Sequence, residues 1–139
     1  MSERQPPFKT KVCMSHKVLL VDDEDDILRS LELTMSNDSR YSLLLAKDGE
    51  TAVELARREK PTVIFLDVLM PGIDGFQVCL TLKSDPETKS SKVIILTALA
   101  QDFDRRKAEE VGADGFFTKP FSPAALLEKL DEVLGNSSG

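Results

Sequence analysis

The sequence predicts an α/β protein built on a parallel sheet with helices on both faces. Segments with strand character and segments with helical character alternate five times between residues 17 and 135, and such alternation is typical of a parallel sheet. Residues 63–66 are apolar at every position, as a central strand buried on both faces should be. The chain has 139 residues, 41% of them hydrophobic, which favours one globular domain.

Five short runs rich in aliphatic, β-branched or aromatic residues are the expected strands. They lie at 17–21, 41–46, 62–66, 92–96 and around Phe116 and Phe117.

The expected helices follow these strands and carry apolar residues at intervals of three or four. In chain order they are a helix containing Ile27, Leu28, Leu31 and Met35, a helix over 48–59, a helix around Phe76 and Leu80 that ends at the turn 84–86, a weak helix over 102–111, and a last helix that begins near Pro123. Proline suits a first helical position because the N–H group there has no partner within the helix. Asp25 is the expected N-cap of the first helix.

The ends of the chain differ from this domain. Residues 1–16 are polar and include Pro6 and Pro7, so we expect a flexible extension, then a domain over 17–135 and a flexible tail over 136–139. No segment is apolar for the length of a signal peptide or a membrane span, and no CxxC pair occurs, which favours a cytoplasmic protein without membrane contact. The net charge of -6 argues against direct binding of nucleic acid.

Chemically distinctive residues directly follow four of the expected strands. They are Asp22 and Asp23 after the first, Asp67 after the third, Thr97 and Ala98 after the fourth, and Lys119 after the fifth. Singly, such residues are more often turn residues, helix caps or solvated charges. Because ligands of doubly wound sheets bind outside the carboxyl ends of the strands, their common edge favours one shared site.

The residue types at this edge suggest phosphoryl chemistry. Clustered carboxylates repel one another unless a cation intervenes, and all-oxygen ligands suit Mg²⁺. Lys119 offers a positive charge and Thr97 a hydroxyl donor for a phosphoryl group, while Asp67 is a candidate nucleophile. No Walker A or GxGxxG sequence occurs, so a loop that cradles a nucleotide is not expected.

Four stretches, VLLVDDE, VIFLDVLMPGIDG, VIILTA and GADGFFTKPF, occur in this order. Together they resemble the receiver domain of two-component response regulators over about residues 17–135. The resemblance implies a five-stranded, flavodoxin-like (βα)5 doubly wound sheet of strand order 2-1-3-4-5, phosphorylated on Asp67. It also implies Mg²⁺ held by Asp22, Asp23, Asp67 and the backbone carbonyl of Leu69.

The same resemblance implies how the phosphoryl group is held and sensed. Thr97, Ala98 and Lys119 would contact it, and Lys119–Pro120 would be a cis peptide. On phosphorylation Thr97 would move toward the phosphoryl group and Phe116 would fill the vacated space. This would switch the face formed by the fourth helix, fifth strand and fifth helix, and so control an output or a partner.

The donor implied is a phosphohistidine on a sensor histidine kinase or a histidine phosphotransfer protein. His16 is interpreted as a surface residue and not as this donor. A homodimer that forms on phosphorylation is compatible with the resemblance. We expect a signalling phosphoacceptor, not an enzyme, that assists its own phosphorylation and slow dephosphorylation.

Two leucines underlie the expectation of slow dephosphorylation. Leu69 lies two residues after Asp67 and Leu99 two residues after Thr97, at positions that tune hydrolysis in the family. Neither side chain can orient an attacking water. Phe116 also lacks the hydroxyl group of a tyrosine, so a switch that needs that hydroxyl is not expected.

Three alternatives stay open at this point. A degenerate receiver would act as an interaction module without phosphorylation, although all acceptor, metal and lysine positions are filled. A small phosphatase or phosphotransferase would normally need an acid near Asp67, where Leu69 stands instead. A flavin-binding module would need a phosphate loop after the first strand, where the acidic run 22–26 would repel FMN phosphate.

Overall fold

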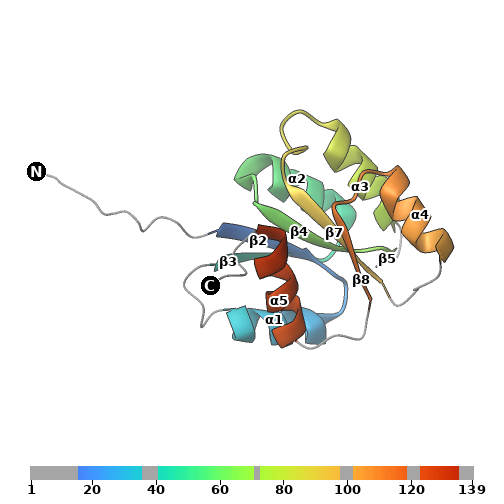
Figure 1. Ribbon diagram of the computed structural model, residues 1–139. Helices are drawn as coiled ribbons and strands as arrows, with labels where there is room; N and C mark the ends of the chain where they lie inside the picture. Colours follow the sequence, from blue (N-terminus) through green and yellow to red (C-terminus); the bar gives the residue numbers. More distant parts are fainter. Residues whose placement is uncertain (1–15, 36–40, 71–72, 98–101, 119–122, 135–139) are drawn as a thin grey trace, which may run out of the picture.

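A five-stranded parallel sheet forms the centre of the molecule (Figure 1). The computed structural model describes residues 16–35, 41–70, 73–97, 102–118 and 123–134. The strands are β2 (His16–Val21), β3 (Tyr41–Ala46), β4 (Val63–Asp67), β7 (Lys92–Thr97) and β8 (Gly115–Thr118). They are ordered β3-β2-β4-β7-β8 and all neighbours are parallel, which confirms the predicted order 2-1-3-4-5.

Three strands differ from the predicted bounds by one residue: β2 and β7 are one residue longer, and β4 is shifted from 62–66 to 63–67. β2 begins at His16, which pairs with Tyr41, one residue before the predicted start. Asp67 pairs with Leu96, and Thr97 pairs with Thr118. Asp67 and Thr97 are therefore the last residues of their strands and not the first residues after them, so the sheet itself fixes the backbone of both.

Five helices connect or follow these strands. They are α1 (Asp25–Met35), α2 (Gly49–Glu59), α3 (Gly75–Ser84), α4 (Asp102–Glu110) and α5 (Pro123–Leu134). Asp48 precedes α2 as its N-cap, and its Oδ1 accepts a hydrogen bond from the Thr51 backbone N–H at 2.7 Å. This bond satisfies one of the free N–H groups at the start of the helix.

The predicted N-cap of α1 is wrong. Asp25 is the first residue of the helix, and the backbone N–H of Leu28 donates to the carbonyl of Glu24 at 3.2 Å, which gives Glu24 the cap position. The cause is local, because Asp22 Oδ1 accepts from the Glu24 N–H at 2.9 Å and closes a turn before the helix. Asp25 forms an ion pair with Lys47, and a hydrogen bond and charge from that lysine lower the pKa of Asp25.

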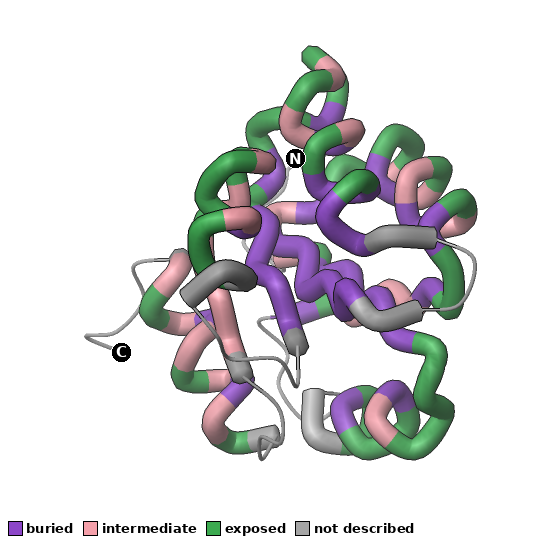
Figure 2. Tube along the Cα trace, turned by 90° about the vertical axis from the view of Figure 1, so that its right-hand side faces the viewer, coloured by how far each residue is buried: buried purple, intermediate pink, exposed green. Residues whose placement is uncertain are grey.

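Hydrophobic residues are buried on both faces of the sheet. Successive residues of β4 alternate, so that Ile64 and Leu66 face the core under α2, α3 and α4, whereas Val63 and Phe65 face the core under α1 and α5. Figure 2 shows the strands as a buried centre with the exposed residues on the outer sides of the surrounding helices. Within the described residues, no helix is both long and apolar enough to cross a membrane.

A small hairpin that the sequence did not predict separates β4 from α3. Its strands are β5 (Leu69–Met70) and β6 (Ile73–Asp74), paired antiparallel as Leu69 with Asp74 and Met70 with Ile73. The hairpin returns the chain to the backbone that follows Asp67, so that α3 begins beside the end of β4.

Candidate functional site

Two buried carboxylates lie at the carboxyl edge of the sheet. Asp22 follows β2, is fully buried, and donates its backbone N–H to the carbonyl of Ala46 at 3.1 Å. Asp67 ends β4 on the neighbouring strand and is 3% exposed. Burial of ionised carboxylates favours the binding of positive charge beside them, so this pair is a candidate site for a cation.

A third carboxylate completes this group. Asp22, Glu24 and Asp67 each offer an oxygen atom, and these oxygens lie within 4.8 Å of one another. Opposite oxygen ligands around one Mg²⁺ are about 4 Å apart, so the donor set suits a hard divalent cation. Asp23, a predicted ligand, is exposed and is not part of this group, and its role stays a prediction. Glu24 was not singled out from the sequence.

Apart from Phe116, the other predicted site residues divide into two sets. The backbone of Leu69 lies in β5, and that of Thr97 lies at the end of β7, beside β4. Metal binding by the Leu69 carbonyl and phosphoryl binding by Thr97 stay predictions. The remaining ones, Ala98, Leu99, Lys119 and the Lys119–Pro120 peptide, lie outside the described residues.

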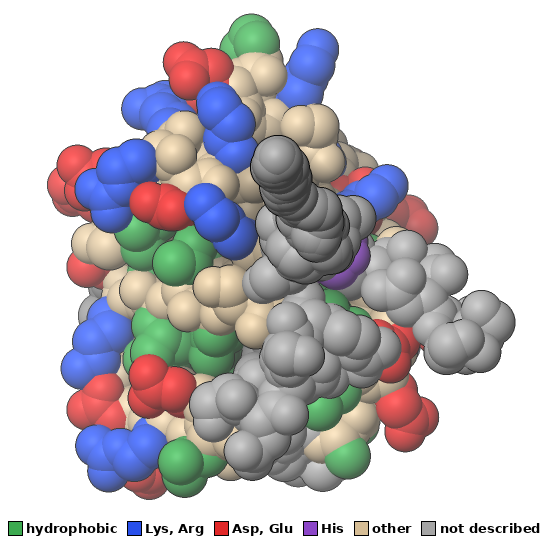
Figure 3. All heavy atoms as spheres, turned by 90° about the vertical axis from the view of Figure 1, so that its left-hand side faces the viewer, with side chains coloured by type: hydrophobic (Ala, Val, Ile, Leu, Met, Phe, Trp, Pro, Cys, Tyr) green, Lys and Arg blue, Asp and Glu red, His purple; other side chains and the backbone are tan. Residues whose placement is uncertain are grey.

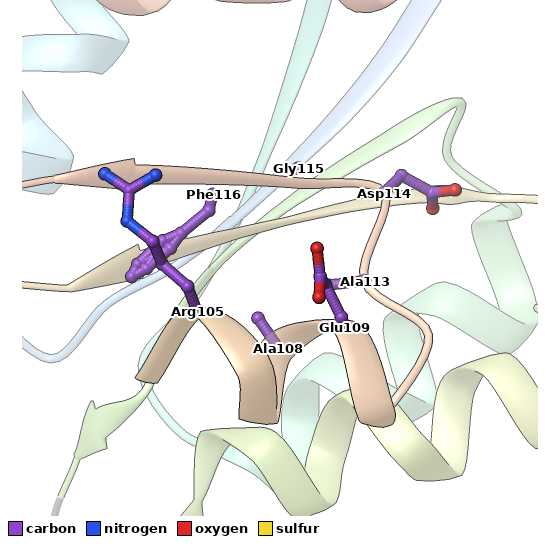
Figure 4. A pocket seen from close by; sticks show the side chains of 7 residues that line it. All are labelled: Arg105, Ala108, Glu109, Ala113, Asp114, Gly115 and Phe116. Atoms are coloured by element: carbon purple, nitrogen blue, oxygen red, sulfur yellow. The ribbon is translucent and has the colours of Figure 1, made fainter. Parts of the chain in front are cut away.

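Phe116, the predicted switch residue, lies in β8 opposite Ile95 and is half-buried. The Arg105 guanidinium carbon lies 5.3 Å from the centroid of its ring, within the range of a cation–π contact. A cavity of about 220 Å³ lies between α4 and β8. Figure 4 shows the Arg105 and Phe116 side chains beside it. The cavity is lined by Arg105, Ala108, Glu109, Ala113, Asp114, Gly115 and Phe116. The ring therefore has open space on the α4 side of the sheet.

The opposite end of the sheet is held by ion pairs. Arg57 pairs with Asp85 at 2.7 Å and Lys60 with Glu87 at 3.4 Å, which joins the end of α2 to the segment after α3. Figure 3 shows basic and acidic side chains interspersed on this side of the molecule. His16 is half-buried here, with its ring centroid 6.3 Å from that of Tyr41 and far along β2 from the acidic group.

A partly exposed network that the sequence did not predict connects α3 to the starts of β7 and β8. Lys83 Nζ lies 2.9 Å from Asp114 Oδ2 and donates to the carbonyls of Lys89 and Ser91 at 2.9 and 3.0 Å. Asp114 Oδ2 also accepts from the backbone N–H of Val93 at 2.9 Å. Nearby, burial raises the pKa of the Cys79 thiol to about 11, as suits a structural cysteine.

The fold and the acidic edge define a doubly wound α/β domain with a carboxylate group at its switch point that could hold a cation. A family model described as the response regulator receiver domain matches residues 18–131. The chain belongs to this family, which confirms the resemblance seen in the sequence.

Relatives and solved structures agree with this assignment. The chain is 42% identical over 117 residues to the response regulator PleD of Caulobacter vibrioides, covering 84% of this chain and 26% of PleD. It is 38% identical over 124 residues to the alkaline phosphatase synthesis transcriptional regulatory protein PhoP of Bacillus subtilis, covering 89% of this chain and 50% of PhoP. The structure of the chemotaxis response regulator CheY4 of Vibrio cholerae superposes with a TM-score of 0.80 at 31% identity. The match covers 86% of this chain and 98% of CheY4. The chain thus spans half or less of the length of PleD and PhoP.

Proposed function

We propose that this receiver domain accepts a phosphoryl group on Asp67 in a Mg²⁺-dependent reaction. The observation that carries the proposal is the burial of Asp67 at the end of β4, with its carboxylate in one group with Asp22 and Glu24. Receiver domains of response regulators interact with histidine kinases, and we propose a phosphohistidine on such a kinase or on a histidine phosphotransfer protein as the donor.

In the proposed reaction an oxygen of Asp67 attacks the phosphorus atom of the phosphohistidine. The P–O bond to Asp67 forms, the P–N bond breaks, and the imidazole nitrogen keeps the electron pair of the broken bond. Bound Mg²⁺ would offset the negative charge of the carboxylates and of the phosphoryl oxygens. The sheet holds Asp67 in place through its pairing with Leu96, so the nucleophile needs little reorganisation.

The output follows from a change in packing. Thr97 would move toward the phosphoryl group, and Phe116 would leave Arg105 for the vacated space. The cavity between α4 and β8 supports this proposal, because it leaves room for α4 to repack when the ring moves. The face of α4, β8 and α5 would then control an output or partner, or form a homodimer. We propose a cytoplasmic signalling role and not enzymatic turnover of separate substrates.

Acetyl phosphate with Mg²⁺ tests the acceptor directly. Intact mass spectrometry of the wild type should show one added phosphoryl group that is lost in Asp67→Asn and on removal of Mg²⁺. An unchanged mass in the wild type would contradict this proposal and favour the alternative, a degenerate receiver that acts as an interaction module without phosphorylation.

A further inference from the structure

Gly75 lies unusually close to the backbone that carries the phosphoacceptor. It is the buried first residue of α3. A Cβ atom at this position would lie 2.4 Å from Val68 Cα, 2.7 Å from the carbonyl oxygen of Asp67 and 2.9 Å from Val68 Cγ1. Two of these atoms belong to the backbone and cannot turn aside as the end of a long side chain can. No side chain larger than hydrogen fits unless the backbone moves.

The requirement at Gly75 is space and not backbone conformation. Among the described residues, the glycine with positive φ is Gly112, at 85°. The φ angle of Gly75 is thus open to any L-residue, and alanine would be the better helix former. The close approach of α3 to β4 explains why glycine occupies this position.

The backbone at Asp67 and Val68 is also fixed from the other side. The Val68 N–H donates to the carbonyl of Leu96 at 3.2 Å, which continues the pairing between β4 and β7. Val68 is 6% exposed. These residues are therefore held between β7 and the start of α3, and the β5–β6 hairpin returns the chain to this contact.

We propose that Gly75 is a positioning residue for the phosphoacceptor site. It lets α3 begin in contact with the Asp67–Val68 backbone, and this contact sets where the Asp67 carboxylate lies relative to Asp22 and Glu24. The inference rests on the proposed function and deepens it, because it assigns the site's alignment to a residue that contributes no ligand atom. Adding one methyl group displaces the backbone of residues 67–69, and with it the carboxylate and the Leu69 carbonyl.

Gly75→Ala tests this, with Leu82→Ala as the matched control. Leu82 is fully buried on the same helix, seven residues after Gly75 and so about 10 Å farther along α3, and its truncation destabilises the helix away from the Gly75 contact. Mg²⁺ affinity is measured by isothermal titration calorimetry at a temperature where both variants are folded. We expect Gly75→Ala to weaken Mg²⁺ binding by about tenfold or more, as for other residues that orient metal ligands without binding the metal, and Leu82→Ala to leave it nearly unchanged.

Phosphorylation by acetyl phosphate at saturating Mg²⁺ gives a second readout. We expect it to slow in Gly75→Ala by on the order of tenfold or more, because misplaced reacting groups lose rate steeply. Wild-type affinity and rate in Gly75→Ala, or equal losses in the two variants at matched stability, would overturn the inference. If the wild type binds Mg²⁺ but gains no phosphoryl group, the proposed function fails, and the Mg²⁺ affinities alone decide the role of Gly75.

A measurement on the unmodified protein covers the case in which Gly75→Ala does not fold. Mg²⁺ is titrated into the wild type while the backbone amide signals are followed by NMR. Because Gly75 touches Val68, the amides of both should shift together, whereas that of Leu82, farther along α3, should move little. A shift at Val68 with none at Gly75 would contradict the proposal, as would a wild type that binds no Mg²⁺.

Discussion

The carboxylates of Asp22 and Asp67 are buried side by side at the ends of β2 and β4, and with Glu24 they bring three acidic oxygens within 4.8 Å. Like charges at this spacing repel, and burial weakens the screening by water. Any ligand that supplies positive charge there should stabilise the fold, since it binds the folded state in preference to the unfolded one.

Asp67→Asn should stabilise the metal-free protein. The amide removes one of the repelling charges at nearly constant volume, and we expect the free energy of unfolding to rise by on the order of 1–2 kcal/mol. Urea denaturation with and without Mg²⁺ measures this. The gain should shrink in Mg²⁺, because the cation relieves the same repulsion in the wild type. Asp26→Asn, an exposed acid outside the group, serves as the control and should show no such gain.

Arg105→Ala should destabilise the unphosphorylated domain slightly, because it removes the cation over the Phe116 ring. An exposed contact of this kind contributes about 0.5–1 kcal/mol. Under the proposed switch, Phe116 leaves Arg105 on activation, so the cost should fall when beryllofluoride mimics the phosphoryl group. The neighbouring exposed Arg106→Ala is the control. An equal cost of Arg105→Ala in both states would show that the ring does not move.

Lys83→Met should destabilise the protein more than substitution of a typical surface lysine does. The substitution leaves Asp114 without its ion pair and removes the hydrogen bonds to the carbonyls of Lys89 and Ser91. Loss of such partly buried charged hydrogen bonds costs about 2–3 kcal/mol. Lys129→Met is the matched control, because Lys129 makes a 3.4 Å pair with the exposed Glu132, and pairs of this kind contribute at most about 0.5 kcal/mol. Equal urea midpoints for the two variants would contradict the assignment.

Asp48, the N-cap of α2, should contribute to the loss of folding stability at acid pH. Hydrogen bonds from the backbone and side chain of Thr51 lower the pKa of Asp48 in the folded protein. A group whose folded pKa is depressed contributes stability above its unfolded pKa of about 3.9 and loses it as pH falls through the folded value. Asp48→Asn keeps a capping oxygen but does not titrate. Unfolding measured from about pH 6 down to pH 2 should therefore show a shallower loss of stability in Asp48→Asn than in the wild type. Parallel curves would contradict the assigned role of Asp48.

The alternation of strands and helices and the acidic edge were predictable because they depend on short apolar runs and on the residues directly after those runs. The apolar stretch 63–66 could only be a central strand, and Asp67 comes immediately after it. Once the strands are parallel, their carboxyl ends meet at one edge whatever the packing of the helices. The family resemblance added the strand order, which the alternation alone does not define.

The parts that were missed depend on contacts between distant residues or on turn geometry. Lys83 and Asp114 lie 31 positions apart, and neither carries a local signal of the pair. The two-residue strands β5 and β6 are too short to show a period of two. The cap of α1 was assigned to Asp25, one of three carboxylates, with Glu24 and Asp26, at or just before the start of the helix. The turn closed by Asp22 decided it for Glu24.

Dephosphorylation should be slow, and Leu69 should be one reason. Leu69 is two residues beyond Asp67, in β5, where its backbone pairs with Asp74. An apolar side chain there cannot orient a water for attack, so we expect an aspartyl-phosphate half-life longer than about a minute in Mg²⁺. In Leu69→Gln, whose amide can orient that water, hydrolysis should be about tenfold faster. Leu80→Gln makes the same change at an exposed leucine of α3 and should leave the rate unchanged. The wild type and the two variants are phosphorylated, separated from excess acetyl phosphate and followed by intact mass spectrometry, which gives the hydrolysis rate of each. A wild-type half-life of only a few seconds would refute the expectation, because hydrolysis that fast requires a water-orienting group.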